Sequence, residues 1–167
     1  MPETLYLFDV DGTLTPHRQP IDEEFASVFL DWLATKGCKV YLVTGSDIAK
    51  TTEQIFPSFI DQCQGLFTCS GNVFYSKGQK VYENTMIIPE GLIENLELYL
   101  EQSEWRQQQG NHIEPRPGMI NFSTLGRNAS QNMREAYTKW DAVSGEREDI
   151  VAYLNELHPT LEVAIGG

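Results

Sequence analysis

The sequence predicts an α/β protein, with a Rossmann-like parallel sheet core followed by a smaller α+β segment. Three observations support this fold class. Short apolar runs typical of buried strands alternate with helical spacing over the first 68 residues. Polar residues suited to ligand binding follow two of these runs, as expected at the carboxyl ends of parallel strands. After residue 82 the pattern becomes mixed, so we place a domain boundary between residues 1–82 and 83–167.

The core begins with an apolar run over residues 5–8 that ends at Asp9 and predicts a buried strand. Residues 21–36 then show helical spacing, and Gly37 is a suitable stop. The apolar positions of that helix are Phe25, Val28, Phe29, Trp32 and Leu33. Strand, helix and strand in this order are typical of a parallel sheet.

A second strand is expected over residues 38–43 and a third over residues 65–68. The second strand runs into Thr44-Gly45-Ser46-Asp47, where Ser46 or Asp47 can cap a helix that extends to about Phe56. Asp9 and Thr44 therefore both lie at carboxyl ends of strands, where open α/β sheets bind their ligands.

The rest of the chain predicts local α+β structure. Ser76-Lys77-Gly78 indicates the turn of a hairpin. The expected elements are a hairpin over residues 72–81, a helix over 92–100, strands over 112–115 and 119–122, a helix over 150–157 and a strand over 161–165. We interpret this second segment as a separate cap domain.

Composition excludes several classes of protein. The formal net charge of −12 and the absence of a Lys/Arg run argue against nucleic-acid binding. No stretch approaches the ~18 apolar residues of a membrane span, and the N-terminus does not look like an export signal. Cys38, Cys63 and Cys69 lack CxxC spacing, which favours reduced structural thiols in a cytoplasmic protein.

The strongest chemical signal is the segment Phe8-Asp9-Val10-Asp11-Gly12-Thr13. Two carboxylates spaced i, i+2 at a strand end can point into one crevice, and the glycine allows a tight turn around an anion. Their mutual repulsion favours a bound cation, and Mg²⁺ binds one or two carboxylates together with phosphate oxygens. Asp9 is then a candidate nucleophile for phosphoryl transfer and Asp11 a candidate proton shuttle.

The competing interpretation is a pair of turn-forming aspartates, which are common in Asp-Gly sequences. Five specified residues match by chance at only ~10⁻⁶ per position. The strand before the motif and the turn after it further favour the catalytic interpretation.

From this motif onward the chain resembles the haloacid dehalogenase superfamily, whose first motif is an apolar strand ending in DxDxT. Within that superfamily it is similar to the eukaryotic-type phosphomannomutases. The similarity runs in order through FDVDGTLTPHRQ, LVTGSD, IEPRPGMINFS, LGRNASQ and LEVAIGG.

The resemblance implies a role for several residues. Asp9 becomes the nucleophile and a magnesium ligand, and Asp11 the general acid/base, whose backbone carbonyl contacts the metal. Arg18 helps to hold the substrate, and Thr44 and Ser46 offer hydroxyls to the transferring phosphoryl group. Arginine suits bidentate phosphate binding, and the arginines that correspond to the distal phosphate site are Arg116, Arg127 and Arg134.

The resemblance also implies a function for the intact protein. It would interconvert mannose 6-phosphate and mannose 1-phosphate for GDP-mannose synthesis, with Mg²⁺ and a hexose 1,6-bisphosphate activator. The family further implies a phosphosugar substrate and a cytoplasmic homodimer formed through the cap.

The resemblance implies further chain beyond Gly167, including a lysine and more magnesium-binding carboxylates. We therefore expect a C-terminally truncated sequence with an incomplete core, which by itself lacks activity. Two alternatives remain open: a sugar-phosphate phosphatase of the same superfamily and a non-catalytic remnant.

Overall fold

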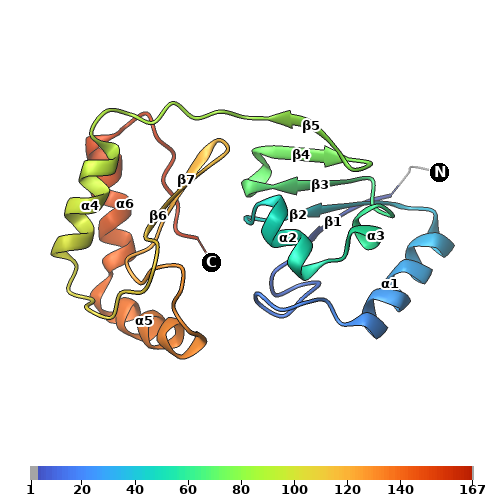
Figure 1. Ribbon diagram of the computed structural model, residues 1–167. Coiled ribbons are helices and arrows are strands. Elements are labelled where there is room, and N and C mark those ends of the chain that lie inside the picture. The colour runs from blue at the N-terminus through green and yellow to red at the C-terminus, as the bar shows by residue number, and fades with distance from the viewer. Residues whose placement is uncertain (1–3, 167) are drawn as a thin grey trace. The chain divides into compact units, whose positions relative to one another are not determined.

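A computed structural model describes residues 4–166, which divide into two compact units. The first unit holds the described residues up to Met86, and the second holds most of those from Ile87 onward (Figure 1). Residues 1–3 and Gly167 lie outside the described residues. The expected end of an incomplete chain at Gly167 therefore lies outside them as well.

The first unit is built on a five-stranded sheet in the order β1-β2-β3-β4-β5. The strands β1, β2 and β3 are parallel, whereas β4 and β5 form an antiparallel hairpin. The bounds are Leu5–Asp9 for β1, Lys39–Val43 for β2, Gly65–Thr68 for β3, Val73–Ser76 for β4 and Gln79–Glu83 for β5. These strands confirm the expected α/β class, and the hairpin forms where Ser76-Lys77-Gly78 predicted it.

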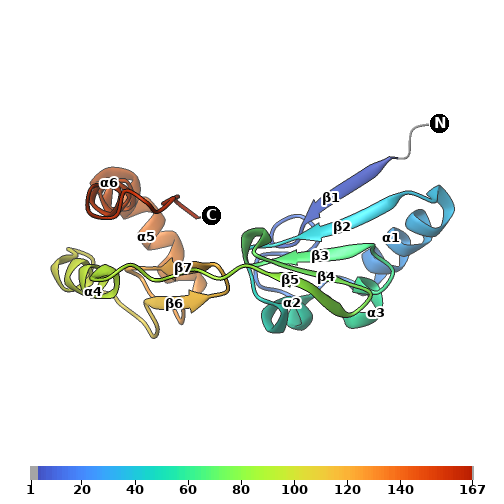
Figure 2. The same ribbon diagram turned by 90° about the horizontal axis from the view of Figure 1, so that it is seen from above.

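Three helices accompany this sheet: α1 (Glu23–Lys36), α2 (Ile48–Gln54) and the short α3 (Pro57–Ile60). A single turn of 3-10 helix, Cys69–Gly71, follows β3. Figure 2 shows the strands fanned by the twist of the sheet, with α2 and α3 together on one side. The four-residue α3 has no helical pattern of its own, which explains why the sequence did not reveal it.

The core of the first unit forms between the helices and one face of the sheet. Val40, Leu42 and Leu66 are completely buried there, and Phe29 of α1 packs edge-on against Phe8 of β1 at a centroid distance of 5.2 Å. The buried face of α1 follows Ala26, Phe29 and Leu33. Two of the apolar positions that indicated the helix, Phe25 and Val28, are exposed.

The second unit contains three helices and most of a two-stranded sheet of β6 (Ile113–Arg116) and β7 (Met119–Phe122). The turn of this hairpin, Arg116–Met119, is grouped with the first unit. The helices are α4 (Leu92–Gln102), α5 (Gln131–Ser144) and α6 (Glu146–Leu157). The sequence interpretation did not include α5, although Ser130 caps its start and Gly145 its end. An apolar cluster forms where Tyr137 of α5 packs beside Trp105.

The strand expected over residues 161–165 is wrong, because those residues form no regular structure. Alternating side chains suggested a strand, but a strand also needs a neighbour to bond its backbone groups. Within residues 4–166, the small sheet of the second unit contains β6 and β7 alone.

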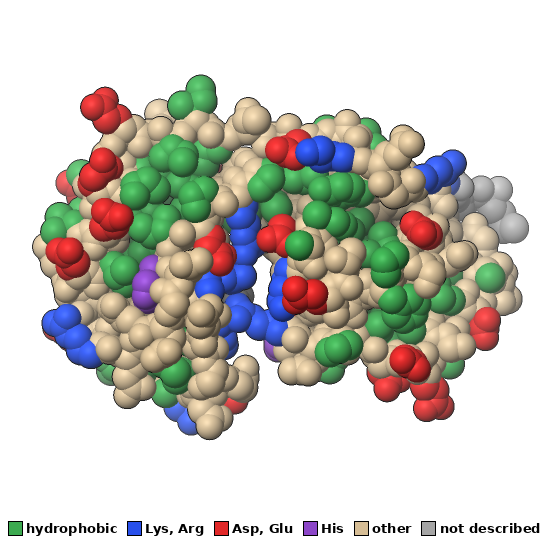
Figure 3. Space-filling model, in the orientation of Figure 1, with side chains coloured by type: hydrophobic (Ala, Val, Ile, Leu, Met, Phe, Trp, Pro, Cys, Tyr) green, Lys and Arg blue, Asp and Glu red, His purple; other side chains and the backbone are tan. Residues whose placement is uncertain are grey.

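The surface agrees with the acidic composition. Acidic side chains are scattered over the face of both units shown in Figure 3 and form no single patch there. Among residues 4–166, the helices are all too short or too polar for a membrane span.

Candidate active site

The candidate site begins at Asp9, the last residue of β1. Asp9 pairs in register with Val43, the last residue of β2, so both strands end at the same edge of the sheet. The Asp9 side chain is exposed at this edge. The loop carrying Thr44 and Ser46 follows β2 directly, so the parallel register brings the two predicted motifs to one edge.

A tight turn after β1 fixes the position of Asp11. The completely buried Val10 offers its carbonyl to the backbone N–H groups of Leu14 and Thr15, at 3.1 and 3.0 Å. Gly12 has φ +79°, a backbone conformation that residues with a side chain rarely adopt. Its N–H donates to the Thr15 carbonyl at 2.8 Å. The glycine of the motif is therefore required by the backbone path of the turn.

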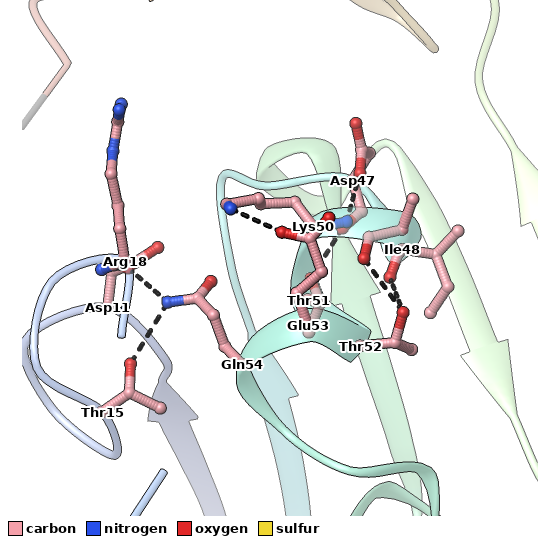
Figure 4. A network of polar contacts seen from close by, with 11 residues as sticks. Asp11, Thr15, Arg18, Asp47, Ile48, Lys50, Thr51, Thr52, Glu53 and Gln54 are labelled. Atoms are coloured by element: carbon pink, nitrogen blue, oxygen red, sulfur yellow. Dashed lines mark hydrogen bonds and ion pairs between the residues drawn. The ribbon is translucent and has the colours of Figure 1, made fainter. Parts of the chain in front are cut away.

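The carboxylate of Asp11 has two hydrogen-bond donors, shown in Figure 4 together with Thr15. Its Oδ1 accepts from the backbone N–H of Arg18 at 2.9 Å and from the side-chain Nε2 of Gln54 at 2.8 Å. Arg18 itself has φ +57°, a conformation uncommon for a residue with a side chain. One oxygen of the candidate acid/base is thus held from two directions.

Gln54 was not among the residues that the sequence indicated. It is the last residue of α2, and its side chain is 3% exposed. Its backbone carbonyl accepts from the N–H of Ile21 at 2.8 Å, which ties α2 to the segment before α1. A lone glutamine in a helix gives no chemical signal, so only the tertiary contact with Asp11 identifies it.

The two hydroxyl residues of the loop after β2 differ in burial. Thr44 is 2% exposed, and its Oγ1 accepts from the N–H of Ser46 at 3.1 Å. Ser46 is half-buried. Behind this loop, the N–H groups of Cys69 and Ser70 donate to the carbonyls of Ser46 and Thr44, at 2.8 and 3.0 Å. The loop backbone is therefore held from the turn after β3.

That supporting turn is strained. Cys69 and Ser70 have φ values of +49° and +55°, which cost of order 1–3 kcal/mol each for residues with side chains. The two amides reach the carbonyls of the loop after β2 in this conformation, which links the strain to the shape of the site.

The predicted arginines lie on different elements. Arg116 is the last residue of β6, Arg127 lies in the loop after β7, and Arg134 lies in α5. Arg127 Nε forms an ion pair with Glu114 Oε2 at 2.9 Å, and Arg134 Nη2 donates to the Arg127 carbonyl at 2.9 Å. The second unit therefore brings Arg127 and Arg134 together, while Asp9, Asp11, Arg18, Thr44 and Ser46 belong to the first unit.

Asp9 and Asp11 are the candidate ligands for a divalent cation at this site. Within residues 4–166, no cluster of three or more His, Cys, Asp or Glu side chains could hold a metal. Mg²⁺ does not require such a cluster, because it keeps several waters and is often bound by one or two carboxylates plus substrate phosphates. The hard oxygen donors of Asp9 and Asp11 fit that pattern.

Comparison with known proteins identifies relatives of the chain. Residues 27–167 match the family model of eukaryotic phosphomannomutase. The chain is 34% identical to a phosphomannomutase of Galdieria sulphuraria over 175 residues, which covers 99% of this chain and 68% of the relative. It is 36% identical to the Saccharomyces cerevisiae phosphomannomutase, with the same coverage.

A solved trehalose-6-phosphate phosphatase of Aspergillus fumigatus is 19% identical, with a TM-score of 0.48 over 99% of this chain and 58% of that chain. The chain spans about two thirds of the length of the curated relatives that it matches. Since the family model covers most of the sequence and full-length relatives share a third of its residues, the chain belongs to the eukaryotic phosphomannomutase family.

Proposed function

We propose that this protein interconverts mannose 6-phosphate and mannose 1-phosphate through a phosphorylated Asp9. The observation that carries the proposal is the placement of Asp9 at the end of β1, in register with the end of β2, in a chain of the phosphomannomutase family. An exposed carboxylate at this edge can meet a phosphate, whereas a buried one could not.

In the first half-reaction, an oxygen of Asp9 attacks the phosphorus of a hexose 1,6-bisphosphate. The bond between that phosphorus and the sugar oxygen breaks, and Asp11 donates a proton to the departing oxygen. The products are an aspartyl phosphate and a hexose monophosphate. In the second half-reaction, the free hydroxyl of a hexose monophosphate attacks the phosphorus of the aspartyl phosphate, and Asp11 accepts the proton of that hydroxyl. The bond between the phosphorus and the Asp9 oxygen breaks, which gives a hexose 1,6-bisphosphate and free Asp9.

The remaining residues of the site hold the substrate. Between the two hydroxyls after β2, the burial of Thr44 and the partial exposure of Ser46 favour Ser46 as the donor to the transferring phosphoryl group. Arg18 and the arginines Arg116, Arg127 and Arg134 supply cationic forks for the phosphates.

The Asp9 carboxylate and the Asp11 backbone carbonyl would hold Mg²⁺, which would neutralise charge between the Asp9 carboxylate and the phosphate. The hexose 1,6-bisphosphate activator, a cytoplasmic location, a homodimer formed through the cap and a role in GDP-mannose synthesis complete the proposal. These features are proposed from the membership of the chain in the family.

The test is to incubate an intact version of the protein, with the length of its curated relatives, with mannose 1-phosphate, Mg²⁺ and a hexose 1,6-bisphosphate, and to follow the products by ³¹P NMR. Formation of mannose 6-phosphate is expected. Release of inorganic phosphate alone would identify a phosphatase instead, and the absence of both products would contradict an enzymatic role for the intact protein.

The nucleophile is tested by Asp9→Asn, which should lower turnover at least ~10³-fold, because an amide cannot form the phosphoenzyme. Asp31→Asn, an equivalent change at an exposed position of α1, serves as the matched control. Binding of beryllium fluoride, followed by ¹⁹F NMR, adds a test without turnover, and its signal should disappear in the Asp9→Asn protein.

A further inference from the structure

The side-chain amide of Gln54 is a buried polar group that the proposed mechanism does not use. Its Nε2 lies 2.8 Å from Asp11 Oδ1 and 3.4 Å from Thr15 Oγ1 (Figure 4). Its Oε1 is buried and has no hydrogen-bond partner within residues 4–166. Gln54 therefore directs its donor toward the carboxylate and leaves its acceptor unsatisfied.

Electrostatics explains this orientation. Rotating the amide by half a turn would place Oε1 against the negatively charged carboxylate of Asp11, which is repulsive. With Nε2 facing Asp11, the amide makes a hydrogen bond to a charged group, which is stronger than a bond between neutral groups. An apolar side chain of similar length could fill the same space with no unsatisfied atom, so packing alone does not account for a glutamine.

We propose that Gln54 is a positioning residue for the proton-transfer step, because it fixes the orientation of the Asp11 carboxylate. With the Arg18 N–H, it occupies Oδ1 from two directions. The proton that passes to or from the sugar oxygen is then handled at Oδ2. This inference rests on the proposed role of Asp11 as the general acid/base.

Backbone hydrogen bonds hold Gln54 and the residues that its amide contacts. Gln54 is the terminal residue of α2, and its own carbonyl is bonded to the N–H of Ile21. Thr15, the second acceptor of the amide, is 3% exposed, and its hydroxyl donates to the Val10 carbonyl at 3.2 Å. The amide is thus held between two fixed segments of backbone.

The experiment compares Gln54→Met with Thr51→Val in steady-state turnover of mannose 1-phosphate, with each substitution made in an intact version of the protein. Methionine keeps the length of the side chain and removes the amide. Thr51 is completely buried in the same helix, and its hydroxyl donates to the Asp47 carbonyl and not to Asp11. Thr51→Val therefore measures the effect of losing a buried hydrogen bond from α2.

We expect Gln54→Met to lower kcat about 10- to 100-fold with KM within about twofold, because misplacing a proton-transfer group costs rate at the chemical step. Thr51→Val should leave kcat within about twofold of the original protein. The inference is overturned if Gln54→Met keeps kcat within twofold, raises only KM, or loses no more activity than Thr51→Val.

A second readout separates this inference from the proposed function. If the original protein forms neither mannose 6-phosphate nor inorganic phosphate, the proposed function fails. The position of the Asp11 carboxylate can then still be followed through the backbone N–H of Arg18, which donates to Asp11 Oδ1. If Gln54 positions Asp11, Gln54→Met should speed hydrogen exchange of the Arg18 N–H at least about fivefold, since the Asp11 carboxylate that accepts from this N–H becomes mobile. Unchanged exchange in Gln54→Met, or an equal increase in Thr51→Val, would refute the positioning role.

Discussion

At the scale of single residues, burial separates side chains that the sequence presents as equivalent. Thr44 and Ser46 both follow β2 and both carry a hydroxyl. Thr44 is 2% exposed and accepts from the Ser46 N–H, so its hydroxyl holds the loop together. Ser46 keeps partial exposure at the edge of the sheet where Asp9 lies.

This difference predicts opposite effects for two substitutions. Thr44→Val should lower the free energy of unfolding by about 1 kcal/mol, because the Ser46 N–H of the half-buried loop loses its acceptor. Ser46→Ala should leave stability within about 0.5 kcal/mol and lower turnover about 10-fold or more. Urea unfolding and kinetics on the same preparations check both effects, and a reversed pattern would show that Thr44 is the active hydroxyl.

Cys63 is a second residue whose burial changes a chemical property, the pKa of its thiol. Cys63 is 5% exposed, and burial raises its pKa to about 12. In the unfolded chain the thiol ionises near its ordinary value of about 8.5. The neutral folded thiol therefore contributes stability at neutral pH that is progressively lost as the pH rises from about 9 toward 12.

We predict that Cys63→Ala flattens the alkaline loss of stability. Between pH 9 and pH 11 the original protein should lose about 2 kcal/mol more than this variant, because alanine has no proton to release on unfolding. Urea unfolding at both pH values gives the difference, with Cys38→Ala as the control at a half-buried cysteine. Identical pH dependence in the original protein and Cys63→Ala would contradict the assigned burial effect.

At the scale of secondary structure, local capping chemistry sets the ends of α1. The Asp22 side chain accepts from the N–H of Phe25 at 2.8 Å and caps the start of the helix. Gly37 ends the helix in the left-handed conformation, with φ +59°. Both signals are local in sequence, which explains why the sequence predicted this helix well.

Removing the N-cap tests how much it contributes. Asp22→Ala should destabilise the protein by about 1 kcal/mol, since the N–H of Phe25 loses its acceptor and the helix N-terminus loses a negative charge. Asp31→Ala, within the same helix and exposed, removes the same charge without a cap and should cost less than about 0.5 kcal/mol. Thermal unfolding of the two variants gives the comparison, and equal destabilisation would argue against the cap.

At the scale of the whole molecule, each unit has its own interior, and that of the second unit is partly polar. Glu146 is 6% exposed, and its Oε2 accepts from the hydroxyls of Thr124 and Tyr137, each at 2.7 Å. Its Oε1 accepts from the Ser103 hydroxyl. Three hydroxyls from separate segments of chain therefore satisfy one buried carboxylate, as a buried charge requires.

This cluster should govern the stability of the second unit. Thr124→Val removes one donor from the carboxylate at nearly constant volume and should cost about 1–3 kcal/mol, because the buried charge is then less well satisfied. Thr138→Val, an exposed position of α5 whose hydroxyl donates to the Arg134 carbonyl, is the control and should cost less. Hydrogen exchange measured at α5 and α6 locates the effect, and equal protection in both variants would count against the cluster.

The accuracy of the sequence-based prediction varies with the range of the interactions involved. The parallel strands, α1 and the β4–β5 hairpin were predicted because their signals lie within a few residues. The strand over residues 161–165 was wrong, because alternation of side chains cannot supply the neighbour that a strand requires. Helical spacing identified α1 but did not specify its buried face, since Phe25 and Val28 are exposed whereas Ala26 is buried.

The sequence by itself determined the α/β class of the first unit, the paired aspartates at the end of β1 and the family to which the chain belongs. These features reside in short segments whose meaning does not depend on distant residues. Only the tertiary structure decided that Thr44 is buried while Ser46 is partly exposed, and that Gln54 faces Asp11 across 43 positions of the chain. The physical reason is that burial and side-chain hydrogen bonds depend on which distant segments pack together, and no local pattern specifies that.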